Sequence, residues 1–328
     1  MQITKISGNG EYAVGAISST AGFRWTARTG AEELITELDA ATGINNFGTI
    51  AGAVPENGGA GNGGRDLGAY APVDAAPVLL DRTLQTNATG YDIADDGTVV
   101  GLSFEDGFAG AAVAFVWTPA DGMTALPVNR PDTYSRANAI SSDGRVIAGW
   151  NDQENGGRTA VVWQDRVPFD LVDADGNGIG EADGVSSNGL YVVGSDYFDA
   201  DTLTSSAWIW SADGGVRPVP GMTFAFGVTN DGKTVIGSTG FFDDPPRAAM
   251  IWREGIGTMT AADFLAEQAI TIPDGWDSGL SGGFTGISAD GRLLGGWSFG
   301  PAGTQSYLIQ LGADDGIFSD GFEAATSP

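Results

Sequence analysis

Residues 140–149 read ISSDGRVIAG, a pattern of an apolar residue, small polar residues, Gly and then alternating apolar residues that recurs along the chain. Asp-Gly or Asn-Gly between two β-rich runs is typical of a tight hairpin, because Asn and Asp tolerate a positive φ and Gly prefers it. Each copy therefore predicts a strand, a tight turn and a second strand. The seven copies begin at Ile6, Ile44, Ile93, Ile140, Val185, Val228 and Ile287, and their turn glycines are Gly10, Gly48, Gly97, Gly144, Gly189, Gly232 and Gly291.

A second pattern follows the hairpins and consists of a small residue, two apolar or aromatic residues and then Trp. The copies that end in Trp are Gly22–Trp25, Ala114–Trp117, Ala160–Trp163, Ala207–Trp210 and Ala249–Trp252. An aliphatic residue replaces the Trp in Ala76–Leu79 and in Ser306–Ile309. The pattern predicts a third strand whose Trp wedges between neighbouring repeats, where its large apolar area stabilises the packing. A ring of sugar-stacking Trp platforms is the alternative, which the strand position and the aliphatic copies disfavour.

Segments such as Gly122–Pro127, Val167–Leu171 and Gly215–Pro220 supply a fourth strand. Four antiparallel strands in each of seven repeats predict an all-β fold, a β-propeller of seven blades. The length agrees, because 328 residues divided among seven blades give about 47 residues each, within the usual range of roughly 40–50. A solenoid is the alternative, but its repeats are usually shorter and its ends need distinct caps. We expect one propeller domain over residues 1–311, followed by residues 312–328 as a C-terminal tail or as the strand that closes the last blade.

The composition excludes several functional classes. The chain has 42 Asp and Glu against 15 Lys and Arg, a net charge of −27, so it lacks the clustered cations that nucleic acid or an anionic membrane surface would attract. It has no His and no Cys, which excludes a Ser-His-Asp triad, a Cys nucleophile and an ordinary zinc site. The sequence contains no run of 18 apolar residues, so it predicts no membrane insertion. The start MQITKISGNG lacks the apolar region of a signal peptide.

Further motifs connect the chain to a known family. Val113-Ala114-Phe115-Val116-Trp117 is one, and Ala262-Asp263-Phe264-Leu265, followed by Pro273-Asp274-Gly275-Trp276 and the last hairpin, is another. With the two repeated patterns, they resemble the HAF family of extracellular repeats, named for a His-Ala-Phe run, although Val113 stands where the His would be. The resemblance implies a secreted or surface-exposed bacterial propeller, a short helix before the Gly-Trp turn, and no established activity. The ending GIFSDGFE, residues 316–323, is similar to one seen on various secreted bacterial proteins.

Residues 173–181, DADGNGIGE, form the sharpest chemical motif. Oxygen ligands at alternate positions, with a Gly that permits a sharp turn, suit a hard cation, so we expect a structural Ca²⁺ here. The predicted ligands are Asp173, Asp175, Asn177, the carbonyl of Ile179, and Glu181. The motif departs from an EF-hand, because Gly180 and Gly184 stand where an apolar residue and a Glu belong, and it is more similar to the calcium loops of integrin alpha-chain propellers. The alternative is a Gly-rich loop with acidic residues and no metal.

Residues 53–75, AVPENGGAGNGGRDLGAYAPVDA, are rich in Gly, Asn and Ala and predict a long loop between the second and third strands of the second repeat. In a propeller, this connection and the loop between blades open onto the same face. The long loop and the Asp173 loop should therefore share one rim with Glu105, Asp106, Trp150 and Asp196. We expect a ligand at this loop-rich rim.

Three functions remain, in order of preference. The first is a non-catalytic extracellular module that binds a glycan, a surface polymer or a protein through its loop-rich face, with no catalytic residue assigned. The second is a carboxylate-based glycoside hydrolase or lyase with channel-facing acids such as Glu105, Asp196 or Asp199, which two close carboxyls in a pocket, one with a raised pKa, would favour. The third is a structural subunit of a surface layer or filament.

Overall fold

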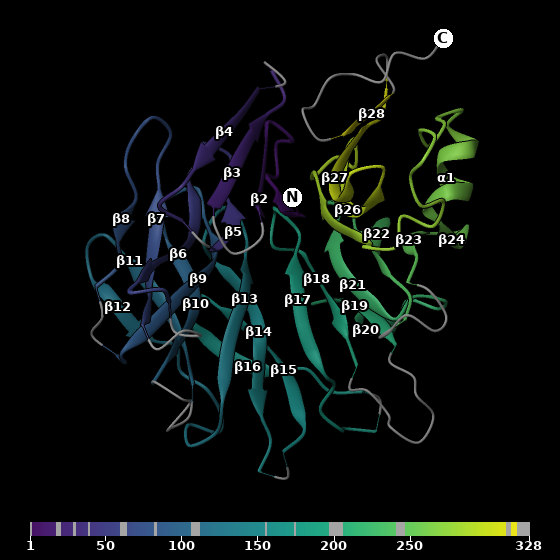
Figure 1. Cartoon of the computed structure of the whole chain (residues 1–328). Helices are drawn as coiled ribbons and strands as arrows, with labels where there is room; N and C mark the ends of the chain where they lie inside the picture. Colours follow the sequence, from purple (N-terminus) through teal and green to yellow (C-terminus); the bar gives the residue numbers. More distant parts are fainter. Residues whose placement is uncertain are drawn as a thin grey trace.

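A computed structural model of the chain describes residues 2–17, 21–28, 31–38, 40–59, 64–81, 84–105, 112–154, 156–173, 175–196, 206–240, 247–312 and 316–319. These residues form seven four-stranded antiparallel sheets, which are blades 1 to 7 in chain order. The blades stand in a ring around a central channel, from the purple first blade to the yellow last one (Figure 1). The predicted seven-bladed β-propeller is thereby confirmed.

The first strand of each blade contacts the first strands of its neighbours and lines the channel. These innermost strands are β1 (Gln2–Ile6), β5 (Ala40–Ile44), β9 (Asn87–Ile93), β13 (Ser135–Ile140), β17 (Glu181–Val185), β21 (Phe224–Val228) and β25 (Phe284–Ile287). The second strands are β2 (Tyr12–Ile17), β6 (Ile50–Glu56), β10 (Val99–Phe104), β14 (Val146–Asp152), β18 (Tyr191–Ser195), β22 (Thr234–Ser238) and β26 (Leu293–Gly300).

The outer half of each blade consists of its third and fourth strands. The third strands are β3 (Ala21–Thr26), β7 (Arg65–Ala71), β11 (Val113–Thr118), β15 (Arg158–Gln164), β19 (Ala207–Ser211), β23 (Ala249–Arg253) and β27 (Gly303–Gln310). The fourth strands are β4 (Ala31–Ile35), β8 (Val78–Leu79), β12 (Gly122–Ala125), β16 (Val167–Asp170), β20 (Gly215–Pro218), β24 (Gly257–Thr260) and β28 (Gly316–Ser319). The strand β28 thus supplies the fourth strand of blade 7 from the segment that the sequence left as tail or strand.

The hairpins that join first and second strands form as the repeat predicts. All seven turn glycines have a positive φ, between 69° for Gly232 and 87° for Gly97. These turns also bond to one another around the ring, as when the Asn46 amide N–H donates to Asp95 at 2.9 Å. Between the last and first blades, the Ala289 N–H donates to the Gly8 carbonyl at 2.8 Å. The hairpin turns therefore form a closed belt at one end of the channel.

The seam between blades 7 and 1 is closed by packing and hydrogen bonds, because each of these blades is built from consecutive strands of the chain. Ile3 and Ile6 of β1 form one buried cluster with Leu293 and Leu308 of blade 7. The Thr285 hydroxyl on β25 donates to the Ile3 carbonyl at 2.7 Å. Burial of apolar surface is the main stabilising contribution at such a contact.

The repeated tryptophans are core residues, as predicted. Trp25, Trp117 and Trp163 are buried, and Trp210 and Trp252 are partly buried against the apolar clusters between blades. The short helix implied by the HAF resemblance is α1 (Ala261–Glu267), which begins after the capping residue Thr260. Among the residues that the structure describes, no helix has the length and the apolar character that a membrane crossing requires.

The prediction of a long loop over residues 53–75 is wrong. The strand β6 continues to Glu56, and β7 occupies residues 65–71, so that Tyr70 takes the place of the Trp and packs against Trp117 with ring centroids 5.3 Å apart. Ala76–Leu79 accordingly contains the fourth strand, not the third. We expected a loop here because Gly and Ala are common in this segment, and β7 itself contains Gly68, Ala69 and Ala71. Packing is close at Gly68, where a Cβ would lie 3.2 Å from side chains of Leu80 and Ala88.

Candidate functional site

Each innermost strand carries a β-bulge at the same level of the channel. The bulged residues are Thr4, Thr42, Tyr91, Asn138, Asp183, Phe226 and Thr285. A bulge leaves its residue outside the pairing of the ladder and re-aims the side chain. In four blades this residue is Thr or Asn and donates to a carbonyl of the next innermost strand, as Asn138 does to Ala182 at 2.8 Å. In blades 3, 5 and 6 the bulged residue is Tyr91, Asp183 or Phe226, so these three blades depart from the Thr or Asn found in the other four.

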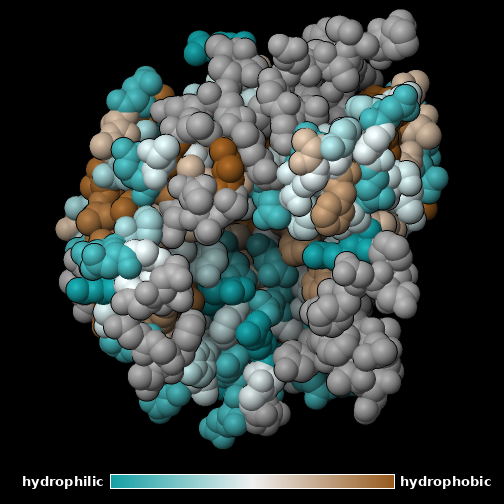
Figure 2. Space-filling view, viewed as in Figure 1, coloured by the Kyte–Doolittle hydropathy of each residue, from teal (hydrophilic) through white to brown (hydrophobic). Residues whose placement is uncertain are grey.

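Asp183 and Phe226 line a cavity of about 570 Å³ at the channel mouth, across blades 4, 5 and 6. We call it the channel-mouth cavity, and its lining side chains include Asp152, Arg158, Glu181, Asp183, Ser195, Asp196, Phe224, Phe226 and Arg247. Figure 2 shows the molecule hollowed near the middle of the view, with hydrophilic residues on the floor of the hollow. A second cavity of about 330 Å³ lies in the channel, and Asp183 and Phe226 line both.

Glu181 is held by two arginines from blade 4. Its carboxylate forms ion pairs with Arg136, at 3.2 Å, and with Arg158. Both guanidinium groups lie over the Trp150 ring, at 5.3 Å and 4.1 Å from its centroid, and Arg158 also lies 3.6 Å from Asp152. These contacts fix the charged side chains in position, since each guanidinium is held by a carboxylate and by an aromatic face.

Asp183 lies two residues further along β17 and has different surroundings. Its burial raises the pKa of the carboxyl to about 8, and the negative charge of Glu181 adds to the rise, against the opposing effects of Arg136 and the Ser195 hydroxyl. That hydroxyl donates to Asp183 at 3.3 Å. The carboxyl is therefore protonated at neutral pH and can donate a proton or a hydrogen bond into the cavity.

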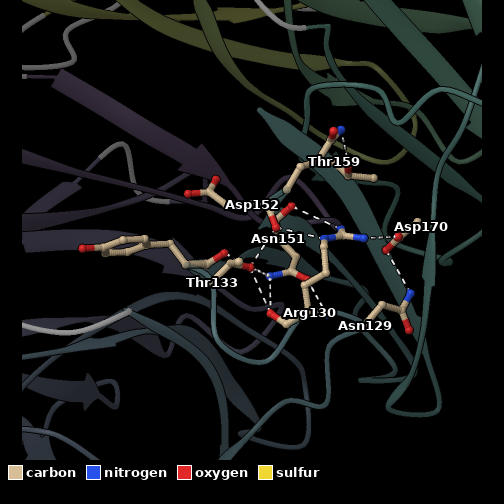
Figure 3. A network of polar contacts seen from close by, with 9 residues as sticks. Asn129, Arg130, Thr133, Asn151, Asp152, Thr159 and Asp170 are labelled. Carbon is tan, nitrogen blue, oxygen red and sulfur yellow. Dashed lines mark hydrogen bonds and ion pairs between the residues drawn. The ribbon is translucent and has the colours of Figure 1, made fainter. Parts of the chain in front are cut away.

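A polar network behind the cavity holds the end of β14, which carries Asp152 (Figure 3). The Asn151 side-chain amide donates to the Thr133 hydroxyl at 2.8 Å. Arg130 donates through Nε to the Asp152 carbonyl at 2.9 Å and forms an ion pair with Asp170 at 2.7 Å. The backbone that carries Asp152 is thus anchored by hydrogen bonds and an ion pair, as a preorganised site requires.

Only some of the residues that we expected at one ligand-binding rim lie together in the structure. Asp196 lines the channel-mouth cavity, and Trp150 lies against Arg158 in its wall. Glu105 lies in another hollow, with Arg65 and Thr86. Asp106 and Asp199 lie outside the described residues.

Sequence reasoning missed Arg136, Arg158 and Arg247, and it considered Asp183 only as a further ligand of the predicted Ca²⁺, directly or through water. A signal was available, because every bulged residue stands two positions before the apolar residue that begins a hairpin copy.

The predicted calcium ligands do not all converge. The Asp173 carboxylate accepts hydrogen bonds from the backbone N–H groups of Asp175 and Asn177, at 2.9 and 2.8 Å, and the bonds from Asn177 lower its pKa. The Ile179 carbonyl accepts from a backbone N–H of β15 at 2.6 Å, and Glu181 is in the arginine pair of the cavity. Within the described part of the chain, no three carboxylates are grouped to hold a metal ion. The calcium site stays a prediction.

The fold and the cavity together define a seven-bladed β-propeller with a ligand-sized site at the mouth of its channel. No family model and no curated protein matches the chain. It is similar to the β-propeller domain of the Trilobed protease from Pyrococcus furiosus, described as having an open velcro topology, with a TM-score of 0.60, 9% identity and 99% of each chain covered. The WD40 propeller domain of Doa1 matches with a TM-score of 0.53 and 11% identity, over 94% of this chain and 93% of that one. At such identities the likeness concerns the fold alone.

Proposed function

We propose that the protein is a non-catalytic binding module that takes its ligand into the channel-mouth cavity. The observation that carries this proposal is the cavity itself, whose volume of about 570 Å³ lies within the range of roughly 300–1,000 Å³ usual for small-ligand sites. The cavity is lined by charged and aromatic side chains, and two of them, Asp183 and Phe226, stand at bulge positions where four other blades have Thr or Asn. Its propeller fold, shared with a WD40 domain, supports an interaction role.

A carbohydrate is the ligand class that these side chains fit best. Sugar hydroxyl groups need both donors and acceptors, and the cavity offers the Arg158 guanidinium, the neutral Asp183 carboxyl and the Asp196 carboxylate. Phe224 and Phe226 stack with ring centroids 6.1 Å apart and present apolar surface beside these groups. A secreted or surface-exposed setting, implied by the HAF resemblance, and a stabilising Ca²⁺ at the Asp173 loop belong to the same proposal.

The test places a bulky ring in the cavity. Asp196 is exposed at the end of β18, so Asp196→Trp should obstruct the cavity without disturbing the core. A panel of neutral and acidic mono- and disaccharides, probed by saturation-transfer NMR, should give at least one binder that Asp196→Trp weakens at least tenfold. Asp213→Trp, in the exposed β19–β20 turn, is the matched control and should bind as wild type does. No binder in the panel, or equal binding to Asp196→Trp, contradicts the proposal.

A carboxylate-based glycoside hydrolase is a second candidate, favoured by one observation. Glu181 and Asp183 face one cavity, and Asp183 has a raised pKa, so it can act as the acid that protonates a leaving oxygen while the other carboxylate assists. Release of nitrophenol from nitrophenyl glycosides should then occur at neutral pH and be lost in Asp183→Asn. Tight binding of a sugar without any release leaves the binding module as the function.

A further inference from the structure

Arg247 lines the channel-mouth cavity from blade 6, and Arg158 lines it from blade 4. The two residues stand at equivalent places in blades 6 and 4, each five positions before the Trp of the third strand. Arg158 is neutralised by Glu181 and lies near Asp152. Among the described residues, Arg247 has no carboxylate within ion-pair distance, and its polar partner is the Ser238 hydroxyl, at 3.1 Å from Nη2.

The Arg247 guanidinium is therefore a half-buried charge without a carboxylate partner among the described residues. Its Nε is buried without a hydrogen-bond partner in the part of the chain that the structure describes, and burial lowers its pKa. A buried cation without a counter-ion is costly. Carboxylates far outnumber cations in this chain, with 42 acidic residues against 15 basic ones, so an arginine without a carboxylate partner stands out. Such an arginine is suited to bind an anionic group of a ligand.

We propose that the ligand is an acidic sugar whose carboxylate pairs with Arg247. This inference rests on the proposed binding function and names the ligand class of the same cavity. The planar guanidinium can bind a carboxylate through two parallel N–H groups. The Ser238 hydroxyl accepts from Nη2 and holds the group in place.

The remaining walls fit the rest of such a sugar. Phe224, whose ring centroid lies 6.0 Å from the Arg247 guanidinium carbon, provides an apolar face next to the anion site. Asp183 and Asp196 of blade 5 line the same cavity and accept or donate hydrogen bonds to hydroxyl groups. A peptide ending in a free carboxylate shares the anionic group, but the cavity offers mostly charged partners where a peptide would present apolar side chains.

The experiment measures calorimetric affinities for four probes: D-glucuronate, D-glucose, glucose 6-sulfate and the peptide Gly-Gly-Gly with a free C-terminus. Wild type should bind glucuronate at least tenfold more tightly than the other three. Arg247→Gln should weaken glucuronate binding at least tenfold and so remove that preference, and Arg247→Lys should recover only part of it, because it keeps the charge without the planar fork. Arg145→Gln is the matched control, since Arg145 pairs with exposed Asp165 away from the cavity.

The outcomes separate this inference from the function on which it rests. If glucose and glucuronate bind wild type equally, or if Arg247→Gln does not weaken glucuronate, the binding module stands and the acidic-sugar assignment is wrong. If the sulfate or the peptide is preferred and depends on Arg247, the anion site stands but the carboxylate sugar is wrong. If no sugar binds, while thermal unfolding shows intact variants, both the carbohydrate ligand and the assignment fail.

Discussion

Glu181 and Asp183 face the same cavity from one strand, yet Glu181 is ion-paired to Arg136 and Arg158 while the hydrogen-bond partner of Asp183 is the Ser195 hydroxyl. The strand β17 thus presents an ion-paired carboxylate, Glu181, and a neutral carboxyl, Asp183, to the same cavity. Such a difference between neighbouring acids arises from their environments, since opposite charges favour the ionised form and burial disfavours it.

Asp183 should make the stability of the protein fall as pH rises. Its pKa is about 8 in the folded chain, against an ordinary value of 3.8. Between these values the unfolded chain loses the proton that the folded chain keeps, so the contribution of Asp183 to stability is fully present below pH 3.8 and is lost as pH rises to about 8. Asp183→Asn should therefore be more stable than wild type by at least about 1 kcal/mol at pH 7.5, because a tenfold change in proton affinity corresponds to about 1.4 kcal/mol. Urea unfolding at several pH values measures this difference.

The control for Asp183 is a carboxyl with the opposite shift. The hydrogen bond from Arg145 lowers the pKa of Asp165, so its contribution is present above the ordinary pKa and is lost as pH falls. Asp165→Asn should thus be the less stable protein at pH 7.5, with the gap closing toward pH 3. The same sign of change in both variants would contradict the assignment of a neutral Asp183.

Substitution of the two equivalent arginines by Met should change stability in opposite directions. Arg247→Met removes an uncompensated charge, keeps the apolar stem, and should stabilise the fold by about 1 kcal/mol. Arg158→Met leaves Glu181 without one of its two cationic partners and should destabilise it by roughly 1–2 kcal/mol, the pair being partly solvent-screened. Urea unfolding at pH 7 compares them, and a loss of stability in Arg247→Met would show that this arginine is structural.

Substitution of a turn glycine in the belt of hairpin turns should lower the stability of the protein through backbone conformation alone. Gly97 has φ of 87°, and a Cβ built there meets nothing within 4 Å. Gly97→Ala should therefore cost about 1–2 kcal/mol through the left-handed conformation. Gly97→Asn should cost less, since Asn tolerates this region. Equal unfolding midpoints for wild type and Gly97→Ala would refute the strain argument.

The seam between the last and first blades should depend on Thr285. Thr285→Val keeps the shape of the side chain but loses the hydrogen bond to the Ile3 carbonyl, at a cost of roughly 0.5–1.5 kcal/mol. Thr89→Val on β9 is the control, because no side-chain hydrogen bond of Thr89 occurs among the described residues. Chemical unfolding of both variants checks the difference, and equal losses would mean that the Thr285 bond does not secure the seam.

Calcium binding at the Asp173 loop has a direct test in thermal unfolding. A ligand that binds only the folded chain raises Tm, so millimolar CaCl₂ should raise Tm relative to EDTA, and Asp175→Ala should abolish the rise. Asp213→Ala, an exposed acid of another loop, is the control. An unchanged Tm would show that the loop is stabilised by the Asp173 hydrogen bonds alone, without a metal.

The sequence by itself determined the blades, because the features that specify them are local. Asp-Gly and Asn-Gly turns require a positive φ whatever surrounds them. Consecutive apolar residues such as Val146–Ala148 need burial on both faces of a blade. The same local logic failed at β7, where Leu67, Ala69 and Ala71 are buried but Gly and Ala dominate the composition. Small residues form a strand there because neighbouring strands lie close to it and leave little room for larger side chains. That close approach arises only when the blades pack together in the ring.

Only the tertiary structure decided which charged residues share a site. Asp196 was expected at the ligand rim and lies there, whereas Glu105 does not, because ring geometry sets the distances between blades. Arg158, Asp183 and Arg247 come from three blades, and their charge states follow from burial and from each other's proximity. A pKa raised by desolvation and an arginine without a carboxylate exist only once the chain has folded, since in the unfolded chain water surrounds every one of these groups.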